Sequence, residues 1–134
     1  MNHQEVAAAE HHGSRKPILV LDDDRSVLSA VERLLKVRGF DVETFLTVDS
    51  FIECAYLREA ACLVLDINLN GVSGIDLKRK LTDTGILPPV IFITARDEDV
   101  TRRAAFSAGC VAYLSKPFSS RDLVEAIEAS QRAQ

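Results

Sequence analysis

Polar residues that could do chemistry follow four short apolar runs in this 134-residue chain. The runs and their endings are Ile18–Leu21 before Asp22-Asp23-Asp24, Leu63–Leu65 before Asp66, Val90–Ile93 before Thr94, and Tyr113-Leu114 before Ser115-Lys116-Pro117. Short runs of this kind are typical of strands buried on both faces of a parallel sheet, and ligands of such sheets bind beyond the carboxyl ends of the strands. We therefore expect at least three carboxylates, a hydroxyl and an ammonium group at one sheet edge, as a site for a divalent cation and a phosphoryl group.

The clustered carboxylates predict a metal site. At an effective dielectric of about 20, each close pair of carboxylates costs on the order of 4 kcal/mol, which a cation would offset. Oxygen ligands without Cys or His favour Mg²⁺, for which Mn²⁺ could substitute. The alternative is an acidic turn that caps the first helix. We expect Asp24 to act as that cap, and Asp22, Asp23 and Asp66 to form the metal site.

Asp66 is the predicted nucleophile. It ends a strand beside the crevice, so its carboxylate could attack phosphorus and form an aspartyl phosphate. In-line phosphoryl transfer needs positive charge and hydrogen bonds around the phosphoryl oxygens. Lys116 would supply a point charge and Thr94 a hydrogen bond, while the small Ala95 leaves a path to the phosphorus.

The elements that must position these residues alternate between strand and helix from Pro17 onward. The expected strands are 18–22, 42–45, 63–66, 90–94 and 111–114. The expected helices are marked by Val27 to Leu35, Val48 to Ala55, Ile75 to Thr82, Asp97 to Gly109 and Ser119 to Ile127. Five strands alternating with five helices predict an α/β fold, a doubly wound five-stranded parallel sheet with helices on both faces.

Length and composition narrow the class of protein. We expect one domain at residues 17–134 behind a disordered tail at 1–16. A net charge of −4 argues against a nucleic-acid partner, because nucleic acid is bound by a basic patch. No apolar run approaches the roughly 18 residues of a membrane span, and no signal peptide is visible, so we expect no membrane partner and a cytoplasmic location. Neither the cysteines nor the tail histidines are expected to bind metal: Cys54, Cys62, Cys110, His3, His11 and His12.

Taken together, the motifs resemble the receiver domain of bacterial two-component response regulators, over about residues 17–130. The matching residues are Val20-Leu21-Asp22-Asp23-Asp24, Asp66 after Leu63-Val64-Leu65, Thr94-Ala95, and Lys116-Pro117-Phe118. Each is common alone, but the combination is highly specific. The resemblance implies a flavodoxin-like receiver fold with strand order 2-1-3-4-5, an order for which a receiver is itself a standard example.

The resemblance also implies roles for individual residues. Asp66 would accept a phosphoryl group from a phosphohistidine of a sensor histidine kinase or a histidine phosphotransfer protein. Asp23 and Asp66 would bind Mg²⁺ directly, and Asp22 would act mainly through water. The backbone carbonyl of Asn68 would complete the protein ligands.

Further roles concern the phosphoryl oxygens and the signal. Thr94 and Lys116 would contact those oxygens, and the Lys116–Pro117 peptide is expected to be cis. Tyr113 matches the family's switch aromatic, which would turn inward when Thr94 moves toward the phosphate; the alternative is an ordinary half-buried strand tyrosine. The face made by the fourth helix, fifth strand and fifth helix would then contact a downstream protein target.

Several further positions bear on how closely the chain follows the family pattern. Asn70 stands where receivers usually carry proline, which makes its loop less constrained. Arg96 and Asn68 lie close to the phosphoryl path and are expected to tune the rate of dephosphorylation. Val111-Ala112 stands where winged-helix regulators usually carry acidic residues that support a symmetric dimer, so that dimer is in doubt.

The leading functional interpretation is a stand-alone receiver, a phosphoacceptor rather than an enzyme, that signals by protein–protein contact. The alternative is the receiver portion of a larger transcription factor or hybrid histidine kinase. A remote third is an Mg²⁺-dependent phosphohydrolase with an aspartyl-phosphate intermediate. Against it, no acid stands two residues after Asp66 and the chain has no length for a substrate-covering cap. Nothing in the sequence supports a degenerate receiver that works without phosphorylation, because all five residues of the expected phosphorylation site are present: Asp22, Asp23, Asp66, Thr94 and Lys116.

Overall fold

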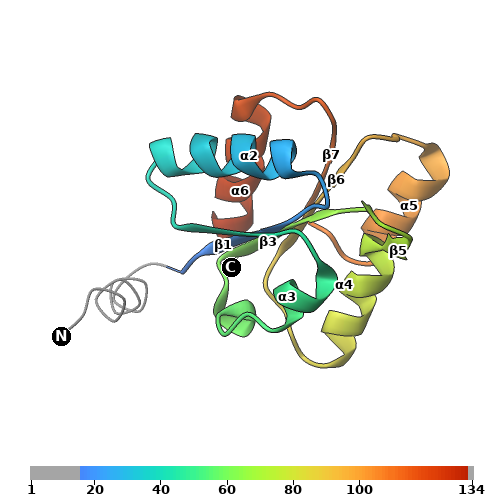
Figure 1. Ribbon diagram of the computed structural model, residues 1–134. Coiled ribbons are helices and arrows are strands. Elements are labelled where there is room, and N and C mark those ends of the chain that lie inside the picture. Colours follow the sequence, from blue (N-terminus) through green and yellow to red (C-terminus); the bar gives the residue numbers. More distant parts are fainter. Residues whose placement is uncertain (1–15, 133–134) are drawn as a thin grey trace.

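A five-stranded parallel sheet lies at the centre of residues 16–132, the part of the chain that this computed structural model describes (Figure 1). Its strands are β1 (Ile18–Leu21), β2 (Val42–Phe45), β3 (Cys62–Asp66), β6 (Val90–Thr94) and β7 (Ala112–Ser115). Their order is β2-β1-β3-β6-β7, which is 2-1-3-4-5 when these five are numbered along the chain. The predicted fold class and strand order are confirmed, whereas the predicted tail lies, apart from Lys16, outside the described residues.

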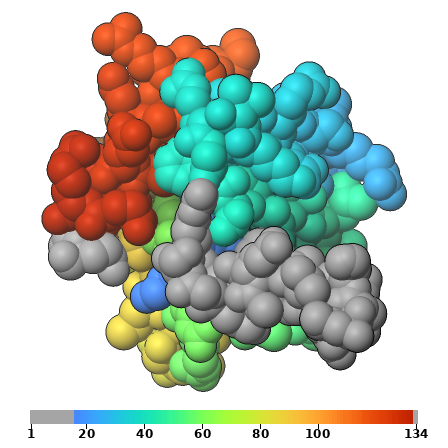
Figure 2. Space-filling model, turned by 90° about the vertical axis from the view of Figure 1, so that its left-hand side faces the viewer, coloured from blue at the N-terminus to red at the C-terminus, as the bar shows by residue number. Residues whose placement is uncertain are grey.

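Helices cover both faces of the sheet, as a doubly wound fold requires. On one face lie α2 (Arg25–Val37) and α6 (Ser120–Arg132), which Figure 2 shows side by side. On the other lie α3 (Val48–Ile52), α4 (Gly74–Asp83) and α5 (Asp99–Ser107). Within residues 16–132, no helix is both long and apolar enough to cross a bilayer.

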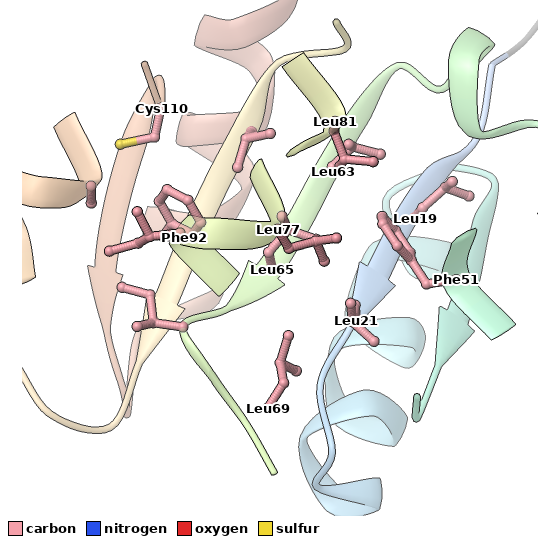
Figure 3. Packing of buried hydrophobic residues seen from close by; sticks show 14 of the residues in the cluster. Leu19, Leu21, Phe51, Leu63, Leu65, Leu69, Leu77, Leu81, Phe92 and Cys110 are labelled. Atoms are coloured by element: carbon pink, nitrogen blue, oxygen red, sulfur yellow. The ribbon is translucent and has the colours of Figure 1, made fainter. Parts of the chain in front are cut away.

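Alternate residues of each strand enter two separate hydrophobic clusters. Leu19, Leu21 and Phe92 pack toward α3, α4 and α5 (Figure 3), whereas Val20 and Ile91 pack toward α2 and α6. Each fully buried side chain of this size contributes roughly 1.5–3 kcal/mol of transfer free energy. Every residue of the three central strands β1, β3 and β6 is buried, so the polar residues that follow these strands can reach solvent only beyond the strand ends.

Two predicted helices are shorter than their sequence pattern indicated. The second ends at Ile52, so Ala55 lies outside it, and the chain turns to place Leu57 of a 3₁₀ turn (Leu57–Glu59) in the core. The fourth begins at Asp99 rather than at Asp97: the backbone of Glu98 is extended, and the Asp97 side chain accepts a hydrogen bond from the Ser115 hydroxyl at the end of β7. The fifth strand is shifted by one residue, to Ala112–Ser115.

A small hairpin occupies the loop between β3 and α4. Strand β4 (Asn68–Leu69) pairs in antiparallel fashion with β5 (Val72–Ser73). The two connecting residues, Asn70 and Gly71, have φ of +47° and +85°. Positive φ at both positions is characteristic of a type I′ turn, for which Asn-Gly is the preferred sequence. The sequence analysis missed this hairpin, although the dipeptide signals it.

Candidate functional site

Three aspartates meet at the carboxyl edge of the sheet. Asp22 and Asp23 directly follow β1, and Asp66 is the last residue of β3. The two strands are neighbours, so one carboxylate oxygen from each aspartate lies within 4.8 Å of the others. The structure thus brings together the three acids that strand endings alone had predicted.

Lys116, which directly follows the edge strand β7, also reaches this cluster. Its ammonium group donates to Asp22 Oδ2 at 2.8 Å and to Asp66 Oδ2 at 3.3 Å. Backbone amides hold the other oxygens: Asp24 N–H donates to Asp22 Oδ1 at 2.9 Å, and Asn68 N–H donates to Asp66 Oδ1 at 3.2 Å. Asp22 and Asp66 are buried, so each carboxylate is fixed by two donors in a largely dehydrated place.

The pKa values of the site follow from this crowding. Burial, and then the Asp22 charge, raise the pKa of Asp66 to about 6, against the opposing effects of Asn68 N–H and Lys116. Burial alone would lower the pKa of Lys116, but its hydrogen bond and attraction to Asp22, and then Asp66, raise it. The ammonium is therefore charged at neutral pH, while Asp66 is ionised only above about pH 6.

The residues fit a divalent cation. Three carboxyl groups cluster here, and the Lys116 ammonium contacts two of them, so acidic groups outnumber this one basic group by two. Their donor atoms are carboxylate oxygens, the ligands that Mg²⁺ prefers. Asn68, whose carbonyl was the fourth expected ligand, opens the hairpin directly beside Asp66.

Gly74 lets the start of α4 approach the site closely. A Cβ at this position would clash with the backbone carbonyl oxygen of Asp66. Its N–H donates to the Ile67 carbonyl at 2.7 Å. The sequence analysis missed this constraint, because no motif in the chain signals it.

Asp24 lies outside the site, as expected. Its Oδ1 accepts from the Ser26 N–H at 2.9 Å and from the Ser26 hydroxyl at 2.7 Å, so it caps α2. The Ser26 hydroxyl bond is the main reason that the pKa of Asp24 is lowered. The acidic run is therefore divided between a helix cap, Asp24, and two members of the carboxylate cluster, Asp22 and Asp23.

Thr94 ends β6 with its hydroxyl turned toward its own loop. The hydroxyl accepts from Arg96 N–H at 3.0 Å and donates to the Arg96 carbonyl at 3.1 Å. Lys116 N–H in turn donates to the Thr94 carbonyl at 2.7 Å, and the Lys116–Pro117 peptide is cis. The threonine and the lysine therefore share a backbone connection, while the side chain of Arg96 is exposed.

Tyr113 is buried beneath a group of charged side chains that sequence reasoning did not foresee. Asp97 accepts from the Ser115 hydroxyl at 2.8 Å and lies 3.6 Å from the Arg102 guanidinium, which stacks 4.8 Å from the Tyr113 ring centroid. Burial and then Asp97 raise the pKa of Tyr113, but no described group meets hydrogen-bond geometry with its enclosed hydroxyl. Phe106 of α5 packs 6.3 Å from the same ring.

A doubly wound parallel sheet that carries three aspartates and a lysine at its carboxyl edge defines a receiver-type α/β domain. The chain belongs to the response regulator receiver domain family, whose sequence model matches residues 18–128. This family is a class of signalling domains rather than of classical enzymes, and it implies a kinase or other phosphodonor as partner.

Named relatives agree with this assignment. The chain is 34% identical over 113 residues to the response regulator protein TodT of Pseudomonas putida, covering 84% of this chain and 50% of TodT. It is 30% identical over 118 residues to the transcriptional regulatory protein TdiR of Thauera aromatica, covering 88% and 52%. The solved structure of the response regulator StyR superposes with a TM-score of 0.80 at 37% identity, covering 90% of this chain and 61% of StyR.

The chain thus spans about half the length of the curated relatives that it matches. This comparison favours the alternative functional interpretation, a receiver within a larger regulator, over the stand-alone receiver that the sequence analysis preferred. TdiR is by name a transcriptional regulatory protein, and about half of it lies outside the region matched here. The prediction that this protein has no nucleic-acid partner therefore applies only to these 134 residues, and it stays a prediction.

Proposed function

We propose that Asp66 is the phosphoacceptor of this receiver domain and takes its phosphoryl group from a phosphohistidine of a sensor kinase or phosphotransfer protein. The observation that carries this proposal is the Asp66 carboxylate itself. It is buried at the sheet edge, lies within reach of two further carboxylates, and is paired with the Lys116 ammonium. No purely structural need explains so much like charge in one place, since each close pair costs free energy.

The transfer would be an in-line displacement. An Asp66 oxygen forms the new P–O bond while the P–N bond of the phosphohistidine breaks, and the leaving imidazole takes up a proton. At pH 7 and above the raised pKa of about 6 still leaves most Asp66 ionised and nucleophilic. Lys116 holds its proton throughout and stabilises the charge on the phosphoryl oxygens.

Asp22, Asp23, Asp66 and the Asn68 carbonyl would hold the Mg²⁺ that accompanies this chemistry, with Mn²⁺ as a substitute. When bound, the cation neutralises charge on the transferring phosphoryl group. The side chains of Asn68 and Arg96 are exposed beside Asp66 and Thr94. We assign them the tuning of water access and hence of the lifetime of the acyl phosphate.

The output would begin at Thr94. Phosphorylation adds roughly two negative charges at Asp66 and offers new acceptors to the Thr94 hydroxyl, which must then leave Arg96. The loop that moves also carries Asp97, and Asp97 contacts Ser115 and Arg102 above Tyr113. The face of α5, β7 and α6, where Phe106 and Val111 are exposed, is the surface on which a downstream protein would detect the change.

We further propose that this receiver regulates transcription as part of a longer protein. TodT and TdiR extend well beyond the matched region, and TdiR is named as a transcriptional regulator. The stand-alone role and the hybrid kinase are the competing arrangements. The coding sequence on either side of this segment distinguishes all three.

The test of phosphotransfer uses acetyl phosphate and MgCl₂ with intact-mass detection. The unsubstituted protein should gain one phosphoryl group, which EDTA prevents, and Asp66→Asn should gain none. Equal labelling of both proteins would overturn the assignment of Asp66. Phosphotransfer from candidate kinases, compared at short incubation times, would then identify the donor.

A further inference from the structure

The β4–β5 hairpin makes a long-range contact with the predicted metal site. The backbone amide of Asn70 donates to Asp23 Oδ2 at 3.0 Å, although the two residues are 47 positions apart. Asp22 and Asp66 are each held by two donors, whereas within residues 16–132 this is the one hydrogen bond of the Asp23 carboxylate. The orientation of Asp23 therefore depends on the hairpin.

The geometry of the turn explains why this amide is available. Leu69 and Val72 pair with each other across the hairpin, so the two residues between them lie outside the ladder. With φ of +47°, Asn70 takes the left-handed conformation, which asparagine tolerates better than most residues. Its N–H then has no backbone acceptor within the turn and is free to meet a carboxylate.

We infer that Asn70 is a positioning residue for divalent-cation binding: its backbone amide, presented by the type I′ turn with Gly71, orients the Asp23 carboxylate. The inference rests on the proposed function only in taking Asp23 as a metal ligand. A ligand held in place before binding loses less freedom when the cation arrives. The same hairpin begins at Asn68, whose amide donates to Asp66, so one hydrogen-bonded hairpin contacts carboxylates that follow or end two different strands.

Two substitutions separate the backbone of residue 70 from its side chain. Asn70→Pro removes the N–H and imposes a φ near −65°, far from the observed +47°. Asn70→Gly removes only the side chain and keeps both the amide and the positive φ. Since the inference concerns the amide, the two variants should behave differently.

Calorimetric titration of the unphosphorylated protein with MgCl₂ at pH 7.5 tests it. Partners that orient metal ligands typically change affinity by 10–100-fold, and we expect Kd to rise about tenfold in Asn70→Pro. In Asn70→Gly it should stay within about twofold. In an Asp23→Asn background, Asn70→Pro should change Kd by less than about threefold, because the two substitutions act on one interaction. Unchanged affinity in Asn70→Pro, or a full tenfold loss that persists in the Asp23→Asn background, would overturn the inference.

Amide hydrogen exchange in EDTA gives a second measurement that needs no proline variant. The Asn70 amide should be protected in the unsubstituted protein and should exchange about tenfold faster in Asp23→Ala, at a pH where the fold is intact. Equal exchange in both proteins would show that the hydrogen bond is absent in solution. Neither measurement involves phosphorylation, so failure of Asp66 to accept a phosphoryl group would refute the proposed function and leave this result standing.

Discussion

Replacing Asp66 with asparagine should stabilise the metal-free protein at neutral pH. The pKa of Asp66 is raised from 3.8 in the unfolded chain to about 6 in the folded protein, mainly by burial and by the Asp22 charge. Between these values the folded protein keeps a proton that the unfolded chain has lost, so stability falls as pH rises through this window. Above about pH 6 the full cost of an ionised Asp66 is present, and an uncharged amide removes it.

The magnitude follows from the shift. A difference of about two pKa units corresponds to about 3 kcal/mol at pH 7.5, since each unit is worth about 1.4 kcal/mol. Asp23 and Lys116 are partly exposed, so solvent screens the site, and we expect about 1–2 kcal/mol. For a domain of this size that is a rise of about 4–8 °C in Tm.

Thermal unfolding in EDTA at pH 7.5 and pH 4.5 measures the effect. At pH 4.5 most of the folded protein carries a proton on Asp66, so the advantage of Asp66→Asn should shrink to about a third. Asp83→Asn makes the same chemical change at an exposed helix end and should shift stability by less than about 0.5 kcal/mol at either pH. An Asp66→Asn protein no more stable than the unsubstituted one at pH 7.5, or an advantage equal at both pH values, would refute the reasoning.

Three further substitutions test other parts of the site. Lys116→Ala removes the ammonium that pairs with Asp22 and Asp66, so urea denaturation in EDTA at pH 7.5 should show that the free energy of unfolding falls by about 3 kcal/mol. Acetyl phosphate should also label this variant more slowly. A variant of normal stability that is labelled at the normal rate would contradict both expectations. Gly74→Ala forces a methyl group against the Asp66 carbonyl and should cost about 1–3 kcal/mol by the same measurement. Gly74 does not have a positive φ, so this cost would come from the clash alone, and unchanged stability would show that the start of α4 can move away from Asp66. Tyr113→Phe removes a buried hydroxyl that has no hydrogen-bond partner among the described residues. The free energy of unfolding should therefore be unchanged or higher by about 1 kcal/mol. A loss of more than about 1 kcal/mol would show that the hydroxyl is hydrogen-bonded in solution.

Much of the fold was predictable because its signals are local. Buried strands such as β3 and β6 are short apolar runs, and the spacing of Leu28 and Val31 marks the inner face of α2. The two helix boundaries that were wrong, at Ala55 and Asp97, depend on distant contacts. Near Ala55 the chain leaves the helix and turns, which buries Leu57 in the core. Asp97 accepts a hydrogen bond from Ser115, which is 18 residues further along the chain. A local sequence pattern shows neither the core contact nor the hydrogen bond.

The same division holds within the site. The sequence by itself determined which acids and which lysine stand at strand ends, because the side-chain types and the apolar runs before them are properties of the chain. Only the tertiary structure decided that Lys116 bridges Asp22 and Asp66. It alone showed that Gly74 must lack a side chain and that an amide of the hairpin holds Asp23. Distances and burial set pKa values and ligand orientation, and both arise only when strands far apart in the chain are packed side by side.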